Sequence, residues 1–229
     1  MTRHTRYAIY YAPPEGSGLA AFGAAWLGWD AATGQPAAHP DLGLDAARLT
    51  STPRKYGFHG TLKPPFRLAD GTDRTQLSAA VAGVAARHNC FDLPVRLARL
   101  GRFCAVVPVG EAPALAALAA LAGDCVQALD RFRAPPTAKE LTKRRAGGLS
   151  PAQEANLTAW GYPYVLDEFR FHLTLTGALA AEEAEAVEAT LADATAGLTA
   201  EPLPVREICL FGEEADGHFR ILERHALTA

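Results

Sequence analysis

The chain has 229 residues, 49% hydrophobic and 21% charged, so it holds enough apolar material for a buried core and fits one large domain or two small lobes. Its formal net charge of −3 argues against a basic surface that grips a long nucleic acid through many phosphate contacts, so any phosphate site must be local. The four cysteines lack C-x-x-C spacing, which favours reduced thiols in a cytoplasmic protein, and the most apolar helical stretch falls short of the ~20 residues that cross a bilayer.

The first half of the chain mixes strands with helices. Residues 6–12 are rich in β-forming side chains and end at a Pro-Pro pair, which predicts a strand. The apolar spacing of GSGLAAFGAAWLGW then predicts a helix, and a loop over 31–53 leads to a strand that contains FHGTL and ends at Pro64-Pro65. A helix over 73–88 and strands over 91–99 and 102–109 follow.

The second half repeats this mixture. It begins with an Ala/Leu-rich helix over 112–132 and a basic, glycine-containing loop. The stretch Ser150-Pro151-Ala152-Gln153 then has the pattern of a capping box with proline at the first helical position, which predicts a new helix. The strand EFRFHLTLTG, an acidic helix over 180–195 and two closing strands, LPVREICLFG and HFRILERHAL, complete the chain.

Each half therefore contains a motif strand, a helix and a hairpin, as expected of a duplicated unit. We predict an α+β fold in which helices pack on largely antiparallel sheets. No low-complexity linker separates the halves, about 1–110 and 111–229, so we expect a single bilobal domain over residues 1–229.

The two halves share the pattern F-H-x-T-L, as FHGTL and FHLTL. Because side chains alternate along a strand, His59 and Thr61 share one face, and His172 and Thr174 repeat the arrangement. The flanking Phe and Leu of each copy share the other face and can anchor the strand against its helices. An H-x-T triplet is too short to be informative by itself, but the common flanks at corresponding places in two similar halves favour a shared site over coincidence.

Two histidines supply what metal-independent phosphodiester cleavage requires. With an unperturbed pKa near ~6.5, one imidazole can accept a proton while the other donates one. One would activate water for attack on phosphorus, and the other would protonate the departing oxygen. The threonine hydroxyls would hold the non-bridging oxygens, where a missing hydrogen bond costs ~2–4 kcal/mol of transition-state stabilisation.

The two motifs resemble the signature of the two-histidine (2H) phosphoesterase superfamily, in which H-x-T-x occurs once in each of two pseudo-symmetric lobes. More closely, YGFHGTLKPPF and LSPAQEANLTAWGYPYVLDEFRFHLTLTG are similar to a bacterial branch described as phosphonate-metabolism proteins, often encoded beside carbon–phosphorus lyase genes. The resemblance implies a bilobal 2H phosphoesterase/RNA-ligase-like fold with the motif strands side by side across a central cleft. It also implies a phosphoric diester hydrolase of the cyclic phosphodiesterase type, with His59 and His172 catalytic and with Thr61 and Thr174 binding phosphate. For this branch it suggests a ribosyl cyclic phosphate from phosphonate breakdown as the substrate.

Two basic residues beside the motifs are further candidates for binding substrate. Lys63 follows the first motif and could neutralise a phosphate at the cleft edge, although a solvated strand-end lysine explains it equally well. Arg170 lies two residues before His172, so in a regular strand it shares the histidine's face, and we favour it as a ligand contact.

The segment before the second motif offers two weaker candidates. The run Lys143-Arg144-Arg145 lies next to Gly147-Gly148, and Arg145 is our candidate to close over a second phosphate, although charge runs are usually solvated. Tyr162, with its aromatic neighbours Trp160 and Tyr164, could stack on a base or ribose, but packing between helix and strand is the more common use of such a cluster.

Several enzyme classes find no support in the sequence. No H-x-H, H-E-x-x-H or Cys/His ligand spacing appears, nor a G-x-x-x-x-G-K-[ST] phosphate loop, a G-x-G-x-x-G fingerprint or a G-x-S-x-G elbow, so we expect neither a metal nor a cofactor. The expected partner is a small phosphoester or nucleotide, without extended nucleic acid or membrane, and the expected state is a monomer. Two alternatives stay open: a 2′,5′ RNA ligase or phosphodiesterase acting on RNA ends, and a non-catalytic nucleotide-binding module.

Overall fold

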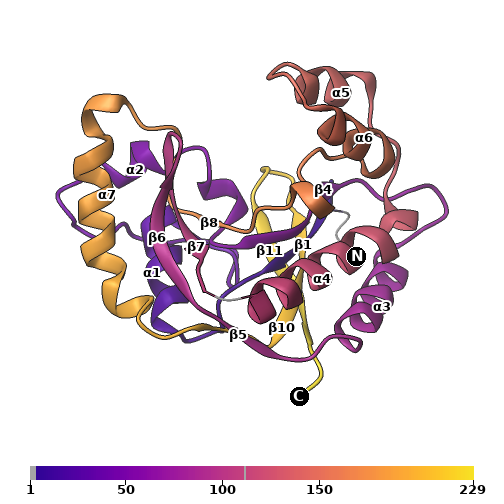
Figure 1. Cartoon of the computed structure of the whole chain (residues 1–229), viewed down its shortest axis with the longest axis horizontal. Helices are drawn as coiled ribbons and strands as arrows, with labels where there is room; N and C mark the ends of the chain where they lie inside the picture. Colours follow the sequence, from indigo (N-terminus) through magenta and orange to yellow (C-terminus); the bar gives the residue numbers. More distant parts are fainter. Residues whose placement is uncertain (1–3, 111) are drawn as a thin grey trace.

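A seven-stranded sheet forms the centre of the computed structural model, which describes residues 4–110 and 112–229 (Figure 1). The strand order is β11-β10-β1-β4-β8-β7-β6, and each of these neighbouring pairs is antiparallel. The strands are β1 (Tyr7–Tyr11), β4 (Gly60–Phe66), β6 (Val95–Leu100), β7 (Phe103–Pro108), β8 (Leu173–Thr174), β10 (Glu207–Glu213) and β11 (Phe219–Ala226). Two small ribbons pair β2 (Trp29–Asp30) with β3 (Gln35–Pro36) and β5 (Phe91–Leu93) with β9 (Leu203–Val205). The predicted α+β class with a largely antiparallel sheet is confirmed.

Both sides of the sheet draw strands from both halves of the chain. The C-terminal hairpin β10–β11 joins β1 through β10, whereas the β6–β7 hairpin of the first half joins β8 of the second half through β7. The sheet is therefore not divided at residue 110. The junction between its two sides is the pairing of β4 with β8, the strands that carry the two motifs.

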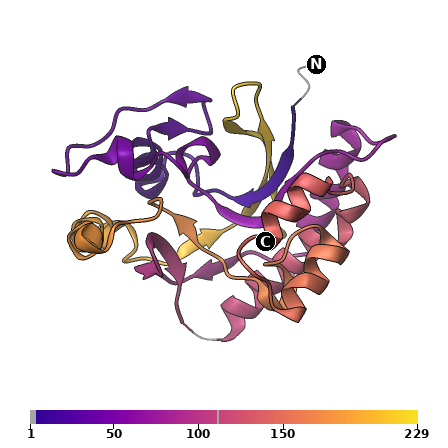
Figure 2. The same cartoon turned by 90° about the horizontal axis from the view of Figure 1, so that it is seen from above.

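The helices form two groups beside the sheet, α1, α2 and α7 at one end and α3 to α6 at the other (Figures 1 and 2). Their bounds are α1 (Gly18–Leu27), α2 (Ala46–Leu49), α3 (Arg74–Ala85), α4 (Ala112–Ala128), α5 (Ala138–Arg145), α6 (Pro151–Trp160) and α7 (Ala181–Thr195). Short 3₁₀ turns are η1 (Arg54–Tyr56), η2 (Asp130–Phe132), η3 (Leu166–Glu168) and η4 (Ala196–Leu198). No helix within the described ranges is long and apolar enough to span a membrane.

Helix caps explain where the α5–α6 hairpin begins. The predicted capping box at the start of α6 is present, since the Ser150 hydroxyl accepts a hydrogen bond from the Gln153 amide and the Gln153 side chain accepts one from the Ser150 amide. The basic segment before it, predicted as a loop, instead contains α5, which begins with a second capping box between Thr137 and Glu140. The spacing T-x-x-E is the signal for this helix.

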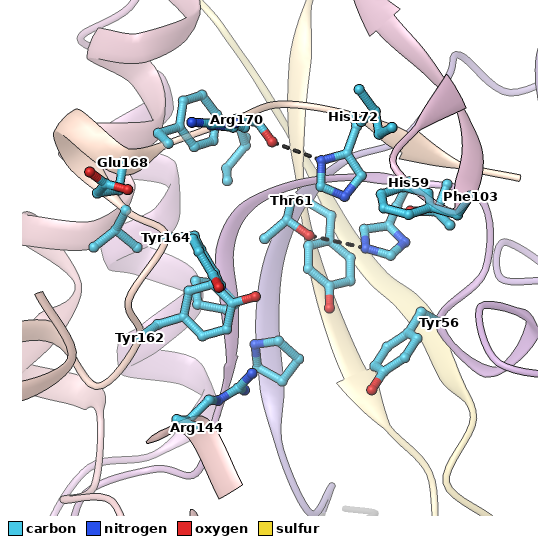
Figure 3. A pocket seen from close by; sticks show the side chains of 18 of the residues that line it. Tyr56, His59, Thr61, Phe103, Arg144, Tyr162, Tyr164, Glu168, Arg170 and His172 are labelled. Carbon is cyan, nitrogen blue, oxygen red and sulfur yellow. Dashed lines mark hydrogen bonds between the residues drawn. The ribbon is translucent and has the colours of Figure 1, made fainter. Parts of the chain in front are cut away.

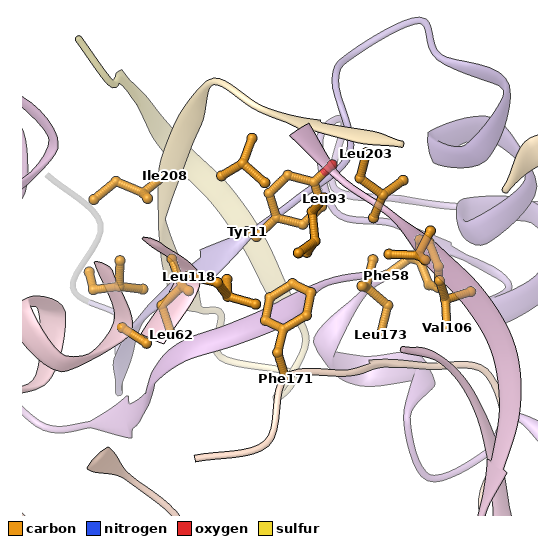
Figure 4. Close-up of a cluster of buried hydrophobic side chains, with 14 of the residues drawn as sticks. Tyr11, Phe58, Leu62, Leu93, Val106, Leu118, Phe171, Leu173, Leu203 and Ile208 are labelled. Carbon is orange, nitrogen blue, oxygen red and sulfur yellow. The ribbon is translucent and has the colours of Figure 1, made fainter. Parts of the chain in front are cut away.

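The apolar side of both motifs lies in the main core, as the strand alternation predicts (Figure 4). Phe58 and Leu62 of the first copy and Phe171 and Leu175 of the second are all at most 7% exposed. Helix α1 is tied to the second motif directly, because the indole nitrogen of Trp26 donates a hydrogen bond of 2.7 Å to the carbonyl of Leu175. Burial of these large side chains, worth ~1.5–3 kcal/mol each, leaves the opposite face of the two strands to the site.

Candidate active site

The two motif strands lie next to each other and run antiparallel. Gly60 pairs with Leu173, so His59 lies across from Thr174, and Thr61 lies across from His172. Directly opposed residues in such a ladder have Cβ atoms ~4.5–5.5 Å apart and point to the same face. All four side chains line one cavity, which brings together the four residues named from the sequence.

Both imidazoles are held in the same way. Nδ1 of His59 lies 2.9 Å from the carbonyl of Gly57, and Nδ1 of His172 lies 2.8 Å from the carbonyl of Arg170. A carbonyl only accepts hydrogen bonds, so Nδ1 carries a proton in each ring and Nε2 is the nitrogen left for chemistry. Gly57, at φ 70°, makes the turn that aims its carbonyl back at His59, a backbone geometry that favours glycine.

His59 lies in the less polar surroundings. Its ring stacks on Tyr10 with 3.7 Å between ring centroids, and Phe211 lies 6.2 Å away. Burial lowers the pKa of His59 to about 4, while its hydrogen bond to Gly57 raises the pKa and the nearby His172 lowers it. His59 is therefore neutral at pH 7, and its Nε2 accepts a hydrogen bond of 3.2 Å from the Thr61 hydroxyl.

The cavity has a volume of about 640 Å³, within the range of small-molecule sites (Figure 3). One wall carries the motif residues with Tyr10, Tyr56 and Phe103, whose ring centroid lies 5.6 Å from that of His172. The facing wall comes from the α5–α6 segment and the chain that leads into β8. Its residues include Arg144, Tyr162, Tyr164, Glu168 and Arg170.

Among the weaker candidates, the structure places Arg170 and Tyr162 at the cavity. The interpretation of Lys63 as a cleft-edge contact is wrong. Thr61 pairs with Tyr10 and Lys63 pairs with Ile9, so β4 has one extra residue at this point, a β-bulge that ends the simple alternation. Lys63 is only 2% exposed, and its ammonium donates a hydrogen bond of 3.0 Å to the carbonyl of Val126 in α4, behind the sheet.

Arg145 is also not among the residues that line the cavity; its neighbour Arg144 is. Because this segment is a helix, consecutive side chains point about 100° apart, and Arg145 points to α6. There its guanidinium forms an ion pair of 2.5 Å with Glu154. The basic run thus contributes to the cavity through a different residue from the one predicted.

Several cavity residues were not identified from the sequence. Tyr10 lies on the site face of β1, whereas the sequence offered no reason to prefer it over Tyr7 or Tyr11. Arg6 lines the cavity and is already held by Glu213 through hydrogen bonds of 2.6 and 2.5 Å. Tyr56 and Phe103 carry no pattern that points to a site; folding alone brings them there.

Comparison with known proteins places the chain in a family. A family model described as "Protein of unknown function (DUF1045)" matches residues 61–220. The chain is 36% identical over 222 residues to a protein of Janthinobacterium sp. (strain Marseille) named ribose 1,5-bisphosphate phosphokinase PhnN, which covers 93% of this chain and 48% of that protein. It is 39% identical over 221 residues to a protein of the same name from Laribacter hongkongensis (strain HLHK9), and this match covers 94% of this chain and 50% of that protein. The chain spans about half the length of these curated relatives.

Among solved structures, E. coli LigT complexed with NADP+ is similar with a TM-score of 0.44 and 16% identity over 100% of both chains. The family model covers more than half of the sequence and includes the second H-x-T motif entirely. The protein therefore belongs to the DUF1045 family.

Proposed function

We propose that this protein is a metal-independent cyclic phosphodiesterase that opens a small cyclic phosphate ester to a phosphate monoester. The observation that carries the proposal is the pair of imidazoles, His59 and His172, each fixed through Nδ1 on the same face of two paired strands, with Nε2 left for the cavity. Two imidazoles with threonine neighbours can perform both proton transfers of the hydrolysis.

In the proposed reaction, the neutral His59 takes a proton from water as the water oxygen bonds to phosphorus. The bond from phosphorus to one ring oxygen breaks, and protonated His172 gives its proton to that oxygen. The products are an alcohol and a phosphate monoester on the same molecule, and the two imidazoles have exchanged protonation states. The neutrality of His59 in the free protein favours its assignment as the base.

The threonines would hold the non-bridging oxygens. In the free protein the Thr61 hydroxyl hydrogen is used by Nε2 of His59. A bound phosphate oxygen can take over that hydrogen, which frees Nε2 to face the attacking water. Hydrogen bonds of this kind strengthen as charge develops on the oxygens, so they lower the barrier more than they improve binding.

A ribosyl cyclic phosphate is the substrate we infer. The curated relatives are named for a kinase of ribose 1,5-bisphosphate and are about twice as long as this chain. This chain has no G-x-x-x-x-G-K-[ST] phosphate loop, so we assign their kinase activity to the half that it does not match. Opening a 1,2-cyclic phosphate of ribose 5-phosphate at the C2 oxygen would give ribose 1,5-bisphosphate, the compound in the relatives' name.

Phosphorus NMR tests the proposal directly. Purified protein with a chelator should convert a ribosyl 1,2-cyclic phosphate to the monoester, and His59→Ala and His172→Ala should each lower the rate by about 10²–10⁴-fold while the thermal transition persists. A panel that includes nucleoside 2′,3′-cyclic phosphates and 2′,5′-linked RNA ends separates the substrate classes. Binding of the cyclic phosphate without conversion over long incubation would refute the catalytic proposal.

A further inference from the structure

The wall that faces the histidines carries an arginine on an aromatic ring. Arg144 lies in the last turn of α5, and its guanidinium carbon is 4.4 Å from the centroid of the Tyr162 ring. Both residues line the cavity, and Figure 3 shows them together with Tyr164 across from the two imidazoles. A guanidinium that contacts an aromatic face can still donate hydrogen bonds to an anion, because its N–H groups lie in its own plane and point outward.

Arg144 differs from Arg6 and Arg145 in its partners. Arg170, the third arginine of the cavity, likewise forms no ion pair within the described residues, but it belongs to the segment that leads into the second motif. Arg6 is neutralised by Glu213, and Arg145 by Glu154. For Arg144, no carboxylate contact occurs among residues 4–110 and 112–229. An arginine that lines a cavity without a carboxylate partner is available to an anionic ligand.

The ion pairs that hold helix α5 in place do not involve Arg144. Helix α5 has no buried residue, and its position is fixed by other groups: Arg67 binds Glu140 at 3.2 Å, and Arg145 binds Glu154. Arg144 takes no part in either ion pair. Its contact with the Tyr162 ring therefore directs the guanidinium to the cavity.

The balance of charge in the cavity also favours an anion. Its lining contains three arginines and one glutamate, although the chain as a whole has a formal charge of −3. Burial raises the pKa of Tyr162, so its hydroxyl stays protonated and can donate a hydrogen bond. Donors thus lie on both walls, at the H-x-T motifs and at Arg144 with Tyr162.

We propose that Arg144 and Tyr162 form a second anion subsite, so that the preferred substrate carries a phosphate besides the cyclic one that reacts between the histidines. This inference rests on the proposed function and narrows its substrate class to bisphosphorylated sugars, in which the second phosphate is a terminal monoester. Arg144 is a specificity-determining residue in this arrangement and takes no part in the proton transfers.

Two substrates that differ only in the second phosphate test the subsite. The wild type should hydrolyse the 1,2-cyclic phosphate of ribose 5-phosphate with a higher kcat/KM than ribose 1,2-cyclic phosphate. Arg144→Ala should lower kcat/KM about 10- to 100-fold for the first substrate, the loss of a charge-assisted hydrogen bond, and leave the second unchanged. Arg144→Lys should restore part of the preference for the substrate with the second phosphate, since lysine keeps the positive charge but lacks the paired N–H donors of the guanidinium.

Lys143→Ala is the matched control, because it removes a positive charge from the same turn of α5, outside the cavity, and breaks no ion pair among the described residues. It should leave the ratio of the two kcat/KM values unchanged. An equal effect of Arg144→Ala on both substrates, or the same change of ratio in Lys143→Ala, would overturn the subsite.

A binding measurement separates failure of the subsite from failure of the proposed function. If neither substrate turns over, the cyclic phosphodiesterase proposal fails, and calorimetry with ribose 1,5-bisphosphate and ribose 1-phosphate still tests the subsite. Arg144→Ala should weaken the Kd of the bisphosphate about 10- to 100-fold and leave that of the monophosphate unchanged. Equal affinities of the wild type for the two compounds would overturn the inference.

Discussion

Gly60, the residue between the histidine and threonine of the first motif, gives the sharpest test of how the two motifs are held together. A methyl group at this position would overlap two carbons of the Phe171 ring, far inside the 3.0 Å below which such contacts essentially do not occur. Gly60 is not among the glycines with positive φ, so the conflict lies in packing and not in the backbone. We expect Gly60→Ala to lower the free energy of unfolding by about 1–3 kcal/mol, the usual effect of overpacking a core.

The same change should reduce activity. Phe171 precedes His172, and Gly60 pairs with Leu173, so a displaced ring moves the second histidine relative to the first. A misplacement of ~1 Å costs about 100-fold in rate. Urea unfolding and turnover of a cyclic phosphate, measured on the same preparation, give the two numbers.

Gly83 provides the control for this experiment. It lies inside α3, and an added methyl group there would have its nearest neighbour 4.0 Å away, at Arg87. Gly83→Ala should therefore raise stability by about 0.5–1 kcal/mol through helix propensity and leave turnover unchanged. Phe171→Leu should partly rescue Gly60→Ala in the double variant. Wild-type stability and turnover in Gly60→Ala would refute the packing argument.

Three further predictions concern the site. Thr61→Val and Thr174→Val should each lower kcat by about 10²–10³-fold with a smaller change in KM, since the hydroxyls act on charge that develops in the transition state; equal losses in binding would contradict this role. The acid limb of the kcat/KM profile should have its midpoint at about pH 4, because the pKa of His59 is lowered to about 4 and the base stays neutral until the pH falls to that value; a midpoint at pH ~6.5 would contradict the assignment. Lys63→Met should leave KM unchanged, because the ammonium donates to the Val126 carbonyl behind the sheet. A clear rise in KM in a folded variant would show that Lys63 does contact the substrate.

The alternation of side chains along a strand was enough to predict the central part of the site. It separates His59 and Thr61 from Phe58 and Leu62, and the structure places the first pair at the cavity and the second in the core. The argument works here because one face is apolar and the other polar in both copies. It does not extend to Lys63, because a β-bulge changes the alternation, and a bulge leaves no reliable mark in a single sequence.

Other parts of the molecule depend on contacts between distant segments. The pairing of β10 with β1 joins residues about 200 positions apart, and no local pattern specifies it. Tyr10 reaches His59 only through the register of β1 against β4. Helix α5, in contrast, could have been predicted from its capping box, and a helix sends Arg144 and Arg145 to different faces. Which of the two faces the cavity depends on how the helix packs.

The middle residue of each motif shows why the two copies differ. In both, the phenylalanine packs on a glycine: the Phe58 ring lies where a methyl group on Gly23 of α1 would be, and the Phe171 ring lies where one on Gly60 would be. The middle residue of the first motif must therefore be glycine, because the Phe171 ring of the second motif occupies the space of a side chain there. Leu173, the middle residue of the second motif, is fully buried and fills the core across from Gly60. The shared residues of F-H-x-T-L thus determine the face that lines the cavity, whereas the residue at x is determined by how the two copies pack on each other.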